Sequence, residues 1–260
     1  MKIGKDLTVS RIGLGTNRIM DDETSAQALR KAVELGVNFI DTAAAYTGGR
    51  SETAIGKTLT GIKKVVIATK GGMLPPPDWV VDSSPKRLSI QLAASLKSLK
   101  TDSIDLYFLH RVDPKVPLKE SIGFLKQMKE DGKIKNVGLS EVTIDQIEEA
   151  RKMVDIVAVE NEYNLTTRHY DDVVDYCGKN GLAFVPFFPL HFQIKDSGLF
   201  ERLRNRYQAT DQQLALAWLL KRSPAMLPIP GSLSMEHLRQ NVNSLKIDLS
   251  EADFDSMSSI

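Results

Sequence analysis

Short apolar runs alternate with amphipathic stretches from one end of the chain to the other, and this alternation restricts the fold more than any other feature. Eight of the runs have the length and residue types expected of β-strands. They lie at residues 11–15, 37–42, 64–70, 103–110, 134–140, 156–164, 182–190 and 226–232. A helical pattern follows each run, and several of these patterns begin at Ser or Thr and end at Gly. The series predicts an α/β fold, a closed parallel (β/α)8 TIM barrel.

The length of the chain fits one such barrel. A chain of 260 residues with 42% hydrophobic residues is expected to form a single domain over residues 1–260. Ahead of the first barrel strand, residues 2–11 (KIGKDLTVSR) predict a small β-hairpin suited to closing the amino-terminal end of the barrel. Two segments that follow strand ends, 75–77 and 191–198, are predicted loops on the opposite face.

Charge and composition restrict the partners. The 34 basic residues nearly balance the 33 acidic ones, and like charges form no long run, so we expect neither nucleic acid nor a membrane surface as a partner. The amino terminus lacks the pattern of a signal peptide, and the apolar stretches are too short to span a membrane. We expect a soluble, cytoplasmic protein with a small-molecule partner. Cys177 has no metal-spaced Cys or His nearby, so we interpret it as a structural thiol and predict no metal site.

Four side chains of different chemistry follow or end successive predicted strands: Asp41, Tyr46, Lys70 and His110. In a parallel barrel these positions share the carboxyl-end face, so we expect the four side chains to converge there. A free phenol has a pKa near 10, and a neighbouring ammonium favours its anion. Tyr46 beside Lys70 could therefore act as a proton donor, with Asp41 orienting the lysine and His110 bonding to a substrate carbonyl.

Each of these residues also has a structural interpretation when taken alone. Asp41 fits a turn cap, Tyr46 a half-buried aromatic, Lys70 a strand end and His110 a core histidine. Their occurrence at consecutive strand ends favours the catalytic interpretation. Two other classes stay open at this stage: a lyase in which Lys70 forms a Schiff base, and a cofactor-sensing module with negligible turnover.

The motifs around these residues resemble the aldo-keto reductase family over nearly the whole chain. They are residues 36–46 (GVNFIDTAAAY), 48–59 (GGRSETAIGKTL), 65–70 (VVIATK), 104–110 (IDLYFLH), 133–140 (KIKNVGLS) and 227–232 (LPIPGS). The resemblance implies an NADPH-dependent carbonyl reductase in which Tyr46 is the general acid, Lys70 and Asp41 tune it, and His110 orients the carbonyl. It also implies a monomer. Segments 159–164, 184–190 and 214–224 are similar to a bacterial branch that includes pyridoxal reductases.

The same resemblance implies a set of cofactor-binding residues. They are Gly15, Thr16, Asn17, Ser140, Glu160, Asn161, Phe187, Pro189, Leu190, Gly231, Ser232, His237, Arg239 and Asn241. Where the family has a Ser-Asn pair and a Gln for the nicotinamide amide, this chain has Ser140-Glu141 and Glu160. An ionised Glu accepts but cannot donate a hydrogen bond, so Ser140 or Asn161 would have to donate to the amide carbonyl. Phe187 replaces a stacking tyrosine and keeps a flat apolar face.

At the adenosine end two expected cations are missing. Ser232 and the free N–H groups of the next helix form an anion site for a 2′-phosphate. Gly231 and His237, however, stand where many family members have lysine and arginine. Arg239 is either within reach of the phosphate or an exposed surface arginine, and Asn241 matches the adenine-contacting position. The resemblance implies NADPH as the cofactor, and the two missing cations make NADH possible as well.

Substrate identity is less constrained. Candidate pocket residues follow the third, fourth and seventh predicted strands, and ordinary loop packing explains them equally well. They are Met73, Trp79, Arg111, His191 and Phe192.

Overall fold

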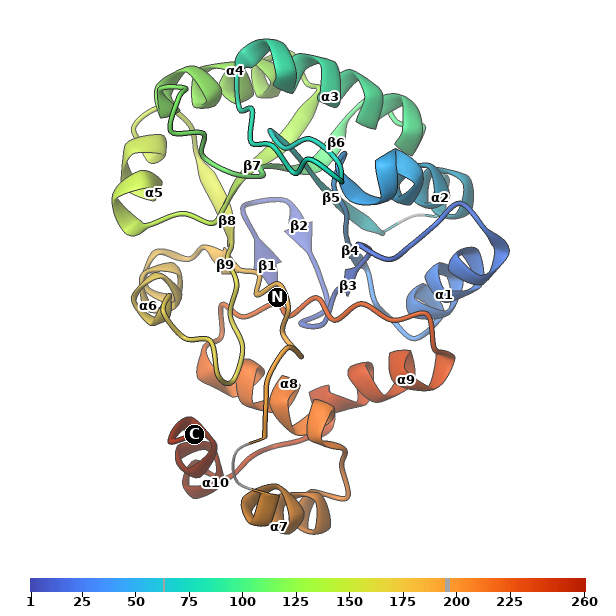
Figure 1. Cartoon of the computed structure of the whole chain (residues 1–260), viewed down its shortest axis with the longest axis vertical. Coiled ribbons are helices and arrows are strands. Elements are labelled where there is room, and N and C mark those ends of the chain that lie inside the picture. Colours follow the sequence, from blue (N-terminus) through green and yellow to red (C-terminus); the bar gives the residue numbers. More distant parts are fainter. Residues whose placement is uncertain (63, 195–196) are drawn as a thin grey trace.

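The computed structural model describes residues 1–62, 64–194 and 197–260. In this part of the chain seven parallel strands lie side by side in sequence order and curl into a ring (Figure 1). The strands are β3 (Leu14–Gly15), β4 (Phe39–Asp41), β5 (Val66–Gly71), β6 (Ile104–Leu109), β7 (Ile134–Ser140), β8 (Ile156–Glu160) and β9 (Ala183–Phe184). The ring with its outer helices is an α/β barrel.

Residues 225–228 close the ring between β9 and β3. The Leu227 N–H donates to the carbonyl of Phe184, and the Gly13 N–H donates to the carbonyl of Pro228, both at 2.9 Å. The prediction of a regular strand over 226–232 is nevertheless wrong, because within the described residues this segment forms only an isolated bridge, between Met226 and Phe184. Pro228 and Pro230 explain the difference, since proline has no N–H to donate to a strand ladder.

Two other strands end several residues before their predicted ends. The strand expected over 156–164 ends at Glu160, and the one expected over 182–190 ends at Phe184. Pro186 has no N–H to donate in the second segment, and beyond it the two segments form an isolated bridge between Glu162 and Phe187 instead of a continuous ladder. Both segments therefore leave the sheet and form loops at the carboxyl ends of the strands.

Helices surround the ring. The eight predicted from sequence are α1 (Glu23–Glu34), α2 (Arg50–Leu59), α3 (Pro85–Leu99), α4 (Leu118–Glu130), α5 (Ile144–Arg151), α6 (Asp171–Asn180), α8 (Asp211–Arg222) and α9 (Met235–Asn243). Their first residues follow the capping signals. Thr143 and Thr210, for example, each form a capping box with the glutamine three residues later.

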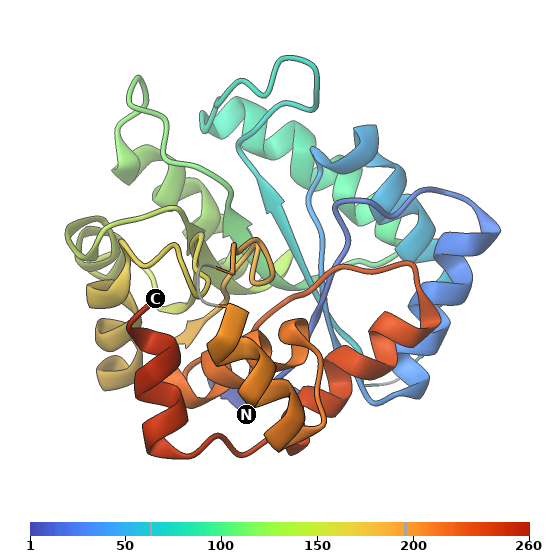
Figure 2. The same cartoon turned by 60° about the horizontal axis from the view of Figure 1, so that its bottom comes forward.

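Two further helices, α7 (Ser197–Tyr207) and α10 (Glu251–Ser258), were not predicted. Short 3₁₀ helices, η1 (Tyr46–Gly49) and η2 (Ser244–Lys246), complete the elements. Figure 2 shows α7 and α10 at the outside of the ring, where both contact α8. The loop predicted at 191–198 includes Lys195 and Asp196, which lie outside the described residues, and its last two residues already belong to α7. α10 buries only Met257, so its apolar period was too weak to indicate a helix.

The predicted hairpin is present as β1 (Lys2–Ile3) paired antiparallel with β2 (Leu7–Thr8). Figure 1 shows it across the centre of the ring. Ile3 and Leu7 pack in the barrel interior against Phe39, Leu106 and Val157. Apolar side chains therefore fill this end of the barrel, and the polar cluster described below lies at the other end.

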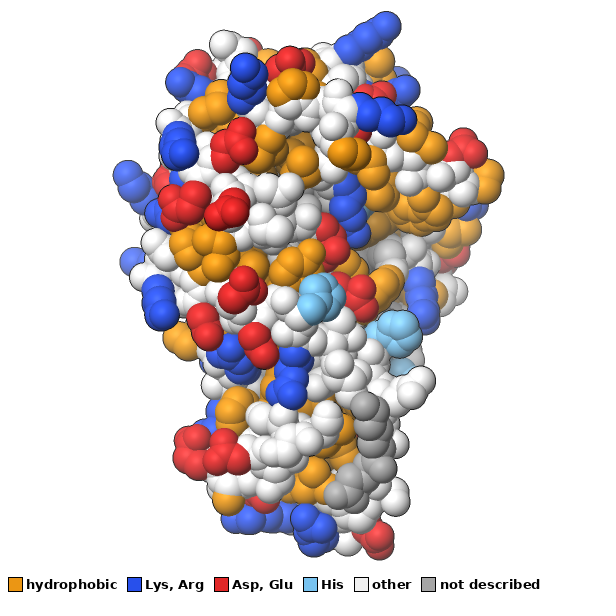
Figure 3. Space-filling view, turned by 60° about the vertical axis from the view of Figure 1, so that its left-hand side comes forward, with side chains coloured by type: hydrophobic (Ala, Val, Ile, Leu, Met, Phe, Trp, Pro, Cys, Tyr) orange, Lys and Arg blue, Asp and Glu red, His pale blue; other side chains and the backbone are white. Residues whose placement is uncertain are grey.

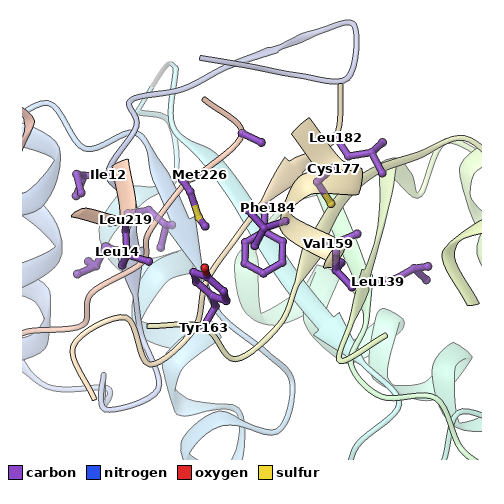
Figure 4. Packing of buried hydrophobic residues seen from close by; sticks show 14 of the residues in the cluster. Ile12, Leu14, Leu139, Val159, Tyr163, Cys177, Leu182, Phe184, Leu219 and Met226 are labelled. Atoms are coloured by element: carbon purple, nitrogen blue, oxygen red, sulfur yellow. The ribbon is translucent and has the colours of Figure 1, made fainter. Parts of the chain in front are cut away.

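A second hydrophobic core lies between the sheet and the helices. Figure 4 shows part of it, including Tyr163 and Phe184, whose rings meet edge to face with centroids 5.6 Å apart. Cys177 is fully buried in this core, and burial raises the pKa of its thiol to about 12. Such a thiol is inert at neutral pH, as its structural interpretation requires.

On the surface, Figure 3 shows one face of the molecule on which basic and acidic side chains are interspersed. None of the helices in the described ranges is long and apolar enough to cross a membrane.

Candidate active site

Asp41, Tyr46, Lys70 and His110 meet at the carboxyl ends of β4, β5 and β6. The ammonium nitrogen of Lys70 lies 2.6 Å from both carboxylate oxygens of Asp41 and 3.3 Å from the hydroxyl of Tyr46. The rings of Tyr46 and His110 meet edge to face, with centroids 5.9 Å apart. Asp41, Lys70 and His110 are buried and Tyr46 is half-buried. The four predicted side chains thus form one cluster with the phenol nearest the solvent.

The backbone explains why they meet. In the parallel register Asp41 lies opposite Ala68 and Lys70 opposite Phe108, so adjacent strands end at the same level. After β4 the chain turns sharply, with Thr47 and Gly48 at φ values of 50° and 65°. The Thr47 hydroxyl fixes this turn by donating to the carbonyl of Ile19 at 3.0 Å. The turn directs Tyr46 back over Lys70.

Glu160, at the end of β8, is a fifth member of this cluster. Its Oε1 lies 3.1 Å from the Lys70 ammonium, and its side chain is 1% exposed. Its Oε2 is buried and bonds to none of the described residues. The resemblance implies a role for Glu160 at the cofactor amide, and the contact with Lys70 is additional. The sequence indicates only that Glu160 ends its strand, in register with Ser140 of β7 and therefore on the same carboxyl-end face as the other four residues.

If Asp41, Glu160 and Lys70 were all ionised, this buried cluster would carry a net negative charge. Burial, and secondly the charge of Asp41, raise the pKa of Glu160 to about 8. Burial also raises the pKa of Asp41, against the opposing effect of Lys70. Burial alone would lower the pKa of Lys70, but the two carboxyl groups outweigh it and raise the pKa. The two carboxyl groups therefore titrate together, and burial favours the protonated form of Glu160 at neutral pH.

The pKa of Tyr46 moves opposite to the expectation from Lys70 alone. Burial raises the pKa of the phenol above its ordinary value; Lys70 lowers it, and Asp41 and Glu160 raise it further. The predicted effect of Lys70 has the right sign but is the smaller one. Burial, Lys70 and Arg111 lower the pKa of His110 well below its ordinary value, so its imidazole is neutral. Its Nδ1 has no bonding partner among the described residues.

The residues predicted for the nicotinamide surround this cluster. Ser140 is buried and accepts a hydrogen bond from Nη1 of Arg111 at 2.9 Å. Asn161 is buried and bonds through both side-chain atoms to the backbone of Val142, which occupies one of its two N–H groups. In the described contacts the Ser140 hydroxyl acts only as an acceptor, so it keeps a proton to donate. Glu141 is also engaged and accepts from the backbone N–H of Glu162 at 2.7 Å.

The predicted stacking residue, Phe187, is half-buried and lies under the guanidinium of Arg111, whose central carbon is 5.4 Å from the ring centroid. Pro189 is buried and Leu190 is half-buried in the same loop. An apolar wall thus flanks the cluster.

At the other end of the site two backbone segments approach closely. A Cβ on Gly15 would lie 2.6 Å from the carbonyl oxygen of Ile229, and one on Gly231 would lie 2.8 Å from that of Gly15. With the backbone in this position, a Cβ at either residue would require one of the two segments to move. Thr16 is buried and donates to the carbonyl of Asp41 at 2.7 Å, whereas Asn17 is exposed.

The residues predicted for the phosphate and adenine lie at the rim. The Ser232 hydroxyl accepts from the backbone N–H of Ser234, and Ser234 caps α9. His237 and Arg239 are both exposed, and Arg239 forms an ion pair with Glu236 of the same helix. Asn241 is buried. The described residues thus provide a helix N-terminus but no cation that is fixed in place there.

The candidate substrate residues differ in exposure. Trp79 is 46% exposed and His191 is exposed, whereas Met73, Arg111 and Phe192 are half-buried. Phe192 stacks on Phe200 of α7 and therefore also belongs to the packing of that helix.

Comparisons with known proteins identify the family of this chain. The model of the aldo/keto reductase family matches residues 11–260. An uncharacterized oxidoreductase of Schizosaccharomyces pombe is 38% identical over 98% of this chain and 87% of its own length. The pyridoxine 4-dehydrogenase of Escherichia coli is 36% identical, over 94% of this chain and 92% of its own length.

A solved structure, an aldo-keto reductase from Klebsiella pneumoniae in complex with NADPH, superimposes with a TM-score of 0.85 at 28% identity. The superposition covers 99% of this chain and 93% of the other. Since the family model matches all but the first ten residues, this chain belongs to the aldo/keto reductase family and is an oxidoreductase.

Proposed function

We propose that this enzyme reduces an aldehyde or ketone to the alcohol with NADPH as its cofactor, and that Tyr46 is the general acid. The observation that carries the proposal is the 3.3 Å contact between the Tyr46 hydroxyl and the Lys70 ammonium, beside a neutral His110. A hydroxyl next to a cation can give its proton to an oxygen that gains negative charge. We further infer that residues 1–260 act as one (β/α)8 domain, with residues 226–229 in the eighth strand position.

When bound, NADPH supplies the hydride that adds to the carbonyl carbon. Tyr46 gives its proton to the carbonyl oxygen, and Lys70 stabilises the phenolate that is left. His110 offers an N–H to the same oxygen and so polarises the carbonyl. Asp41 holds the Lys70 ammonium with both carboxylate oxygens. The phenolate regains a proton from solvent, which completes the balance of one hydride and one proton per alcohol.

The residues around the cluster fit a nicotinamide. Phe187 offers a half-buried aromatic face, and Oε2 of Glu160 is a buried polar atom without a partner. Because Glu160 holds a proton at neutral pH, it can donate to a carboxamide carbonyl as the family's glutamine does. The Ser140 hydroxyl accepts from Arg111 and still has its own proton to donate.

NADPH is favoured by the relative whose structure contains it. The rim, however, supports only a modest preference over NADH, because Gly231 and His237 replace the expected cations and Arg239 is already paired with Glu236. The candidates for the rest of the cofactor are Gly15, Thr16, Asn17, Asn161, Pro189, Leu190, Ser232 and Asn241. Among these, Thr16 and Asn161 act through the backbone geometry that they fix.

For the substrate we propose pyridoxal, on the strength of the 36% identity to a pyridoxine 4-dehydrogenase. The half-buried and aromatic side chains after β5 and β9 would accept a flat aldehyde of this size. Such a wall would accept other aldehydes as well.

The alternative of a Schiff-base lyase is not supported. A Schiff base needs a neutral amine, and the pKa of Lys70 is raised rather than lowered. A cofactor-sensing module without turnover would not need the contact of Tyr46 with Lys70 and His110.

The test is an assay of NADPH consumption with pyridoxal, aromatic aldehydes and short aliphatic aldehydes, with the alcohol identified as the product. We expect turnover with several aldehydes and with pyridoxal among the better ones. If pyridoxal were inert while aromatic aldehydes reacted efficiently, the substrate proposal would fail. If none of the aldehydes consumed NADPH, the reductase proposal itself would fail.

A further inference from the structure

Arg111 is a cation at the candidate site that the proposed reaction does not use. It follows His110 directly, and its side chain is half-buried. Nη1 donates to the carbonyl of His110 at 2.6 Å and to the hydroxyl of Ser140 at 2.9 Å. The guanidinium also covers the ring of Phe187. It is therefore held over the cluster by groups from three parts of the ring.

The charge of this guanidinium is not neutralised. None of the described carboxylates lies within ion-pair distance of Arg111, whereas the half-buried Arg222 contacts both Asp171 and Asp175. The charge of Arg111 nevertheless reaches the cluster, since it is one of the causes that lower the pKa of His110. A cation that is partly removed from water without a counter-ion favours binding of an anion.

The remaining donors of Arg111 have the geometry for that anion. A guanidinium carries five N–H donors, and the described contacts all use Nη1. The Nε and Nη2 edge donates to none of the described residues and forms the planar fork that matches a carboxylate or phosphate.

We propose that Arg111 is an anion subsite for the substrate, so that between two aldehydes of the same skeleton, such as pyridoxal and its 5′-phosphate, the enzyme prefers the one that carries a carboxylate or a phosphate. This inference rests on the proposed carbonyl reduction and names its substrate class. The anion would bind to the Nε and Nη2 edge while Nη1 keeps its bonds to Ser140 and the backbone. The carbonyl end then lies beside His110, the neighbouring residue.

The test compares substrate pairs that differ in charge. Suitable pairs are succinic semialdehyde with butanal, 4-carboxybenzaldehyde with its methyl ester, and pyridoxal 5′-phosphate with pyridoxal. In the pair whose anion fits the subsite, the wild type should favour the anionic member by roughly ten- to hundredfold in kcat/KM. The pair with the largest ratio distinguishes a carboxylate from a phosphate ligand, and the ratio should fall with added salt.

Three variants isolate the charge. Arg111→Met should bring the ratio near unity, mainly by raising KM for the anionic member, and Arg111→Lys should keep part of it. Arg30→Met, on the exposed face of α1, is the matched control and should leave the ratio unchanged. Equal losses for both members in Arg111→Met, or a wild type without preference, would overturn the subsite.

A binding measurement separates this proposal from the reductase proposal. Calorimetric titration of succinate, benzoate and inorganic phosphate should detect binding to the wild type and at least about tenfold weaker binding to Arg111→Met. Binding of this kind without aldehyde turnover would retain the anion subsite and remove the reductase assignment. If none of these anions bound and neutral aldehydes were reduced, the reductase assignment would stand and the subsite would be wrong.

Discussion

The two ends of the candidate site differ in how their charges are held. At the inner end Asp41, Lys70 and Glu160 are each at most 1% exposed and contact one another directly. At the rim His237 and Arg239 are exposed, and the partner of Arg239 is a residue of the same helix.

This difference decides how far a substitution acts. Buried charges interact through a medium of low polarity, so a change in one shifts the pKa of all the others. Exposed charges are screened by water and salt and act nearly alone. Substitutions at the inner end should therefore alter chemistry and pH dependence, and those at the rim only the affinity for one cofactor.

The largest effect is expected for Tyr46→Phe. The variant removes the proposed acid but keeps the ring that meets His110. Turnover should fall by roughly 10²–10⁴-fold, while the Kd for NADPH, measured by fluorescence titration, should hardly change. Tyr207→Phe is a matched control, because its hydroxyl bonds to Asp253 away from the site. Near-wild-type turnover of Tyr46→Phe would contradict the assignment of the acid.

Glu160→Gln should have the next largest effect, on the pH profile. The pKa of Glu160 is raised to about 8, so the wild type acquires a negative charge beside Tyr46 above that pH. This charge raises the pKa of Tyr46 and makes it a poorer acid, so aldehyde reduction should decline as the pH rises through 8. Glutamine keeps the neutral form, and the decline should move up by about one pH unit or more.

Stability should follow the same titration. Between the ordinary carboxyl pKa of 4.5 and about 8, the folded protein keeps a proton that the unfolded chain has lost. The free energy of unfolding should therefore fall as the pH rises across that window, and fall less in Glu160→Gln.

The control for the pH–activity profile is Glu52→Gln. It removes another buried acid, which accepts a hydrogen bond from Thr69, and should leave the pH dependence of activity unchanged. If Glu160→Gln also left the pH dependence of activity unchanged, Glu160 would have no part in the proton transfer.

The smallest effect is expected for His237→Arg at the rim. An added cation should strengthen NADPH binding by up to roughly tenfold and leave NADH binding nearly unchanged, because only NADPH carries the 2′-phosphate. Gln240→Arg adds the same charge elsewhere on α9 and should have less effect. Titration of both cofactors against both variants measures this. Equal gains for the two cofactors would place His237 away from the phosphate.

Much of the fold could be predicted because its signals are local. Capping residues such as Thr143 and Thr210 mark helix starts, and the apolar runs mark most of the strands. The last strand, over residues 226–232, was predicted from its apolar side chains, and this pattern does not show that Pro228 and Pro230 lack the N–H groups of a regular strand. Helix α10 was missed because it buries almost nothing.

The sequence predicts those residues of the site that lie at strand ends. Asp41, Lys70 and His110 end or follow strands, so their convergence follows from the parallel register. The contact of Glu160 with Lys70 and the engagement of Asn161 with Val142 depend on rotamers, which a linear pattern does not contain. The sign of the pKa change of Tyr46 depends on burial, which the sequence interpretation left out.

The segment that closes the barrel has a consequence for the folded state as a whole. Pro228 accepts a backbone hydrogen bond from Gly13, but neither Pro228 nor Pro230 can donate one, so the ring has a seam between its first strand and its last segment. Gly15 and Gly231, the proposed cofactor contacts, line this seam on its two sides. A dinucleotide bound there would contact both edges of the ring and hold them together. Such an enzyme would owe part of its resistance to heat and proteolysis to the cellular supply of its cofactor.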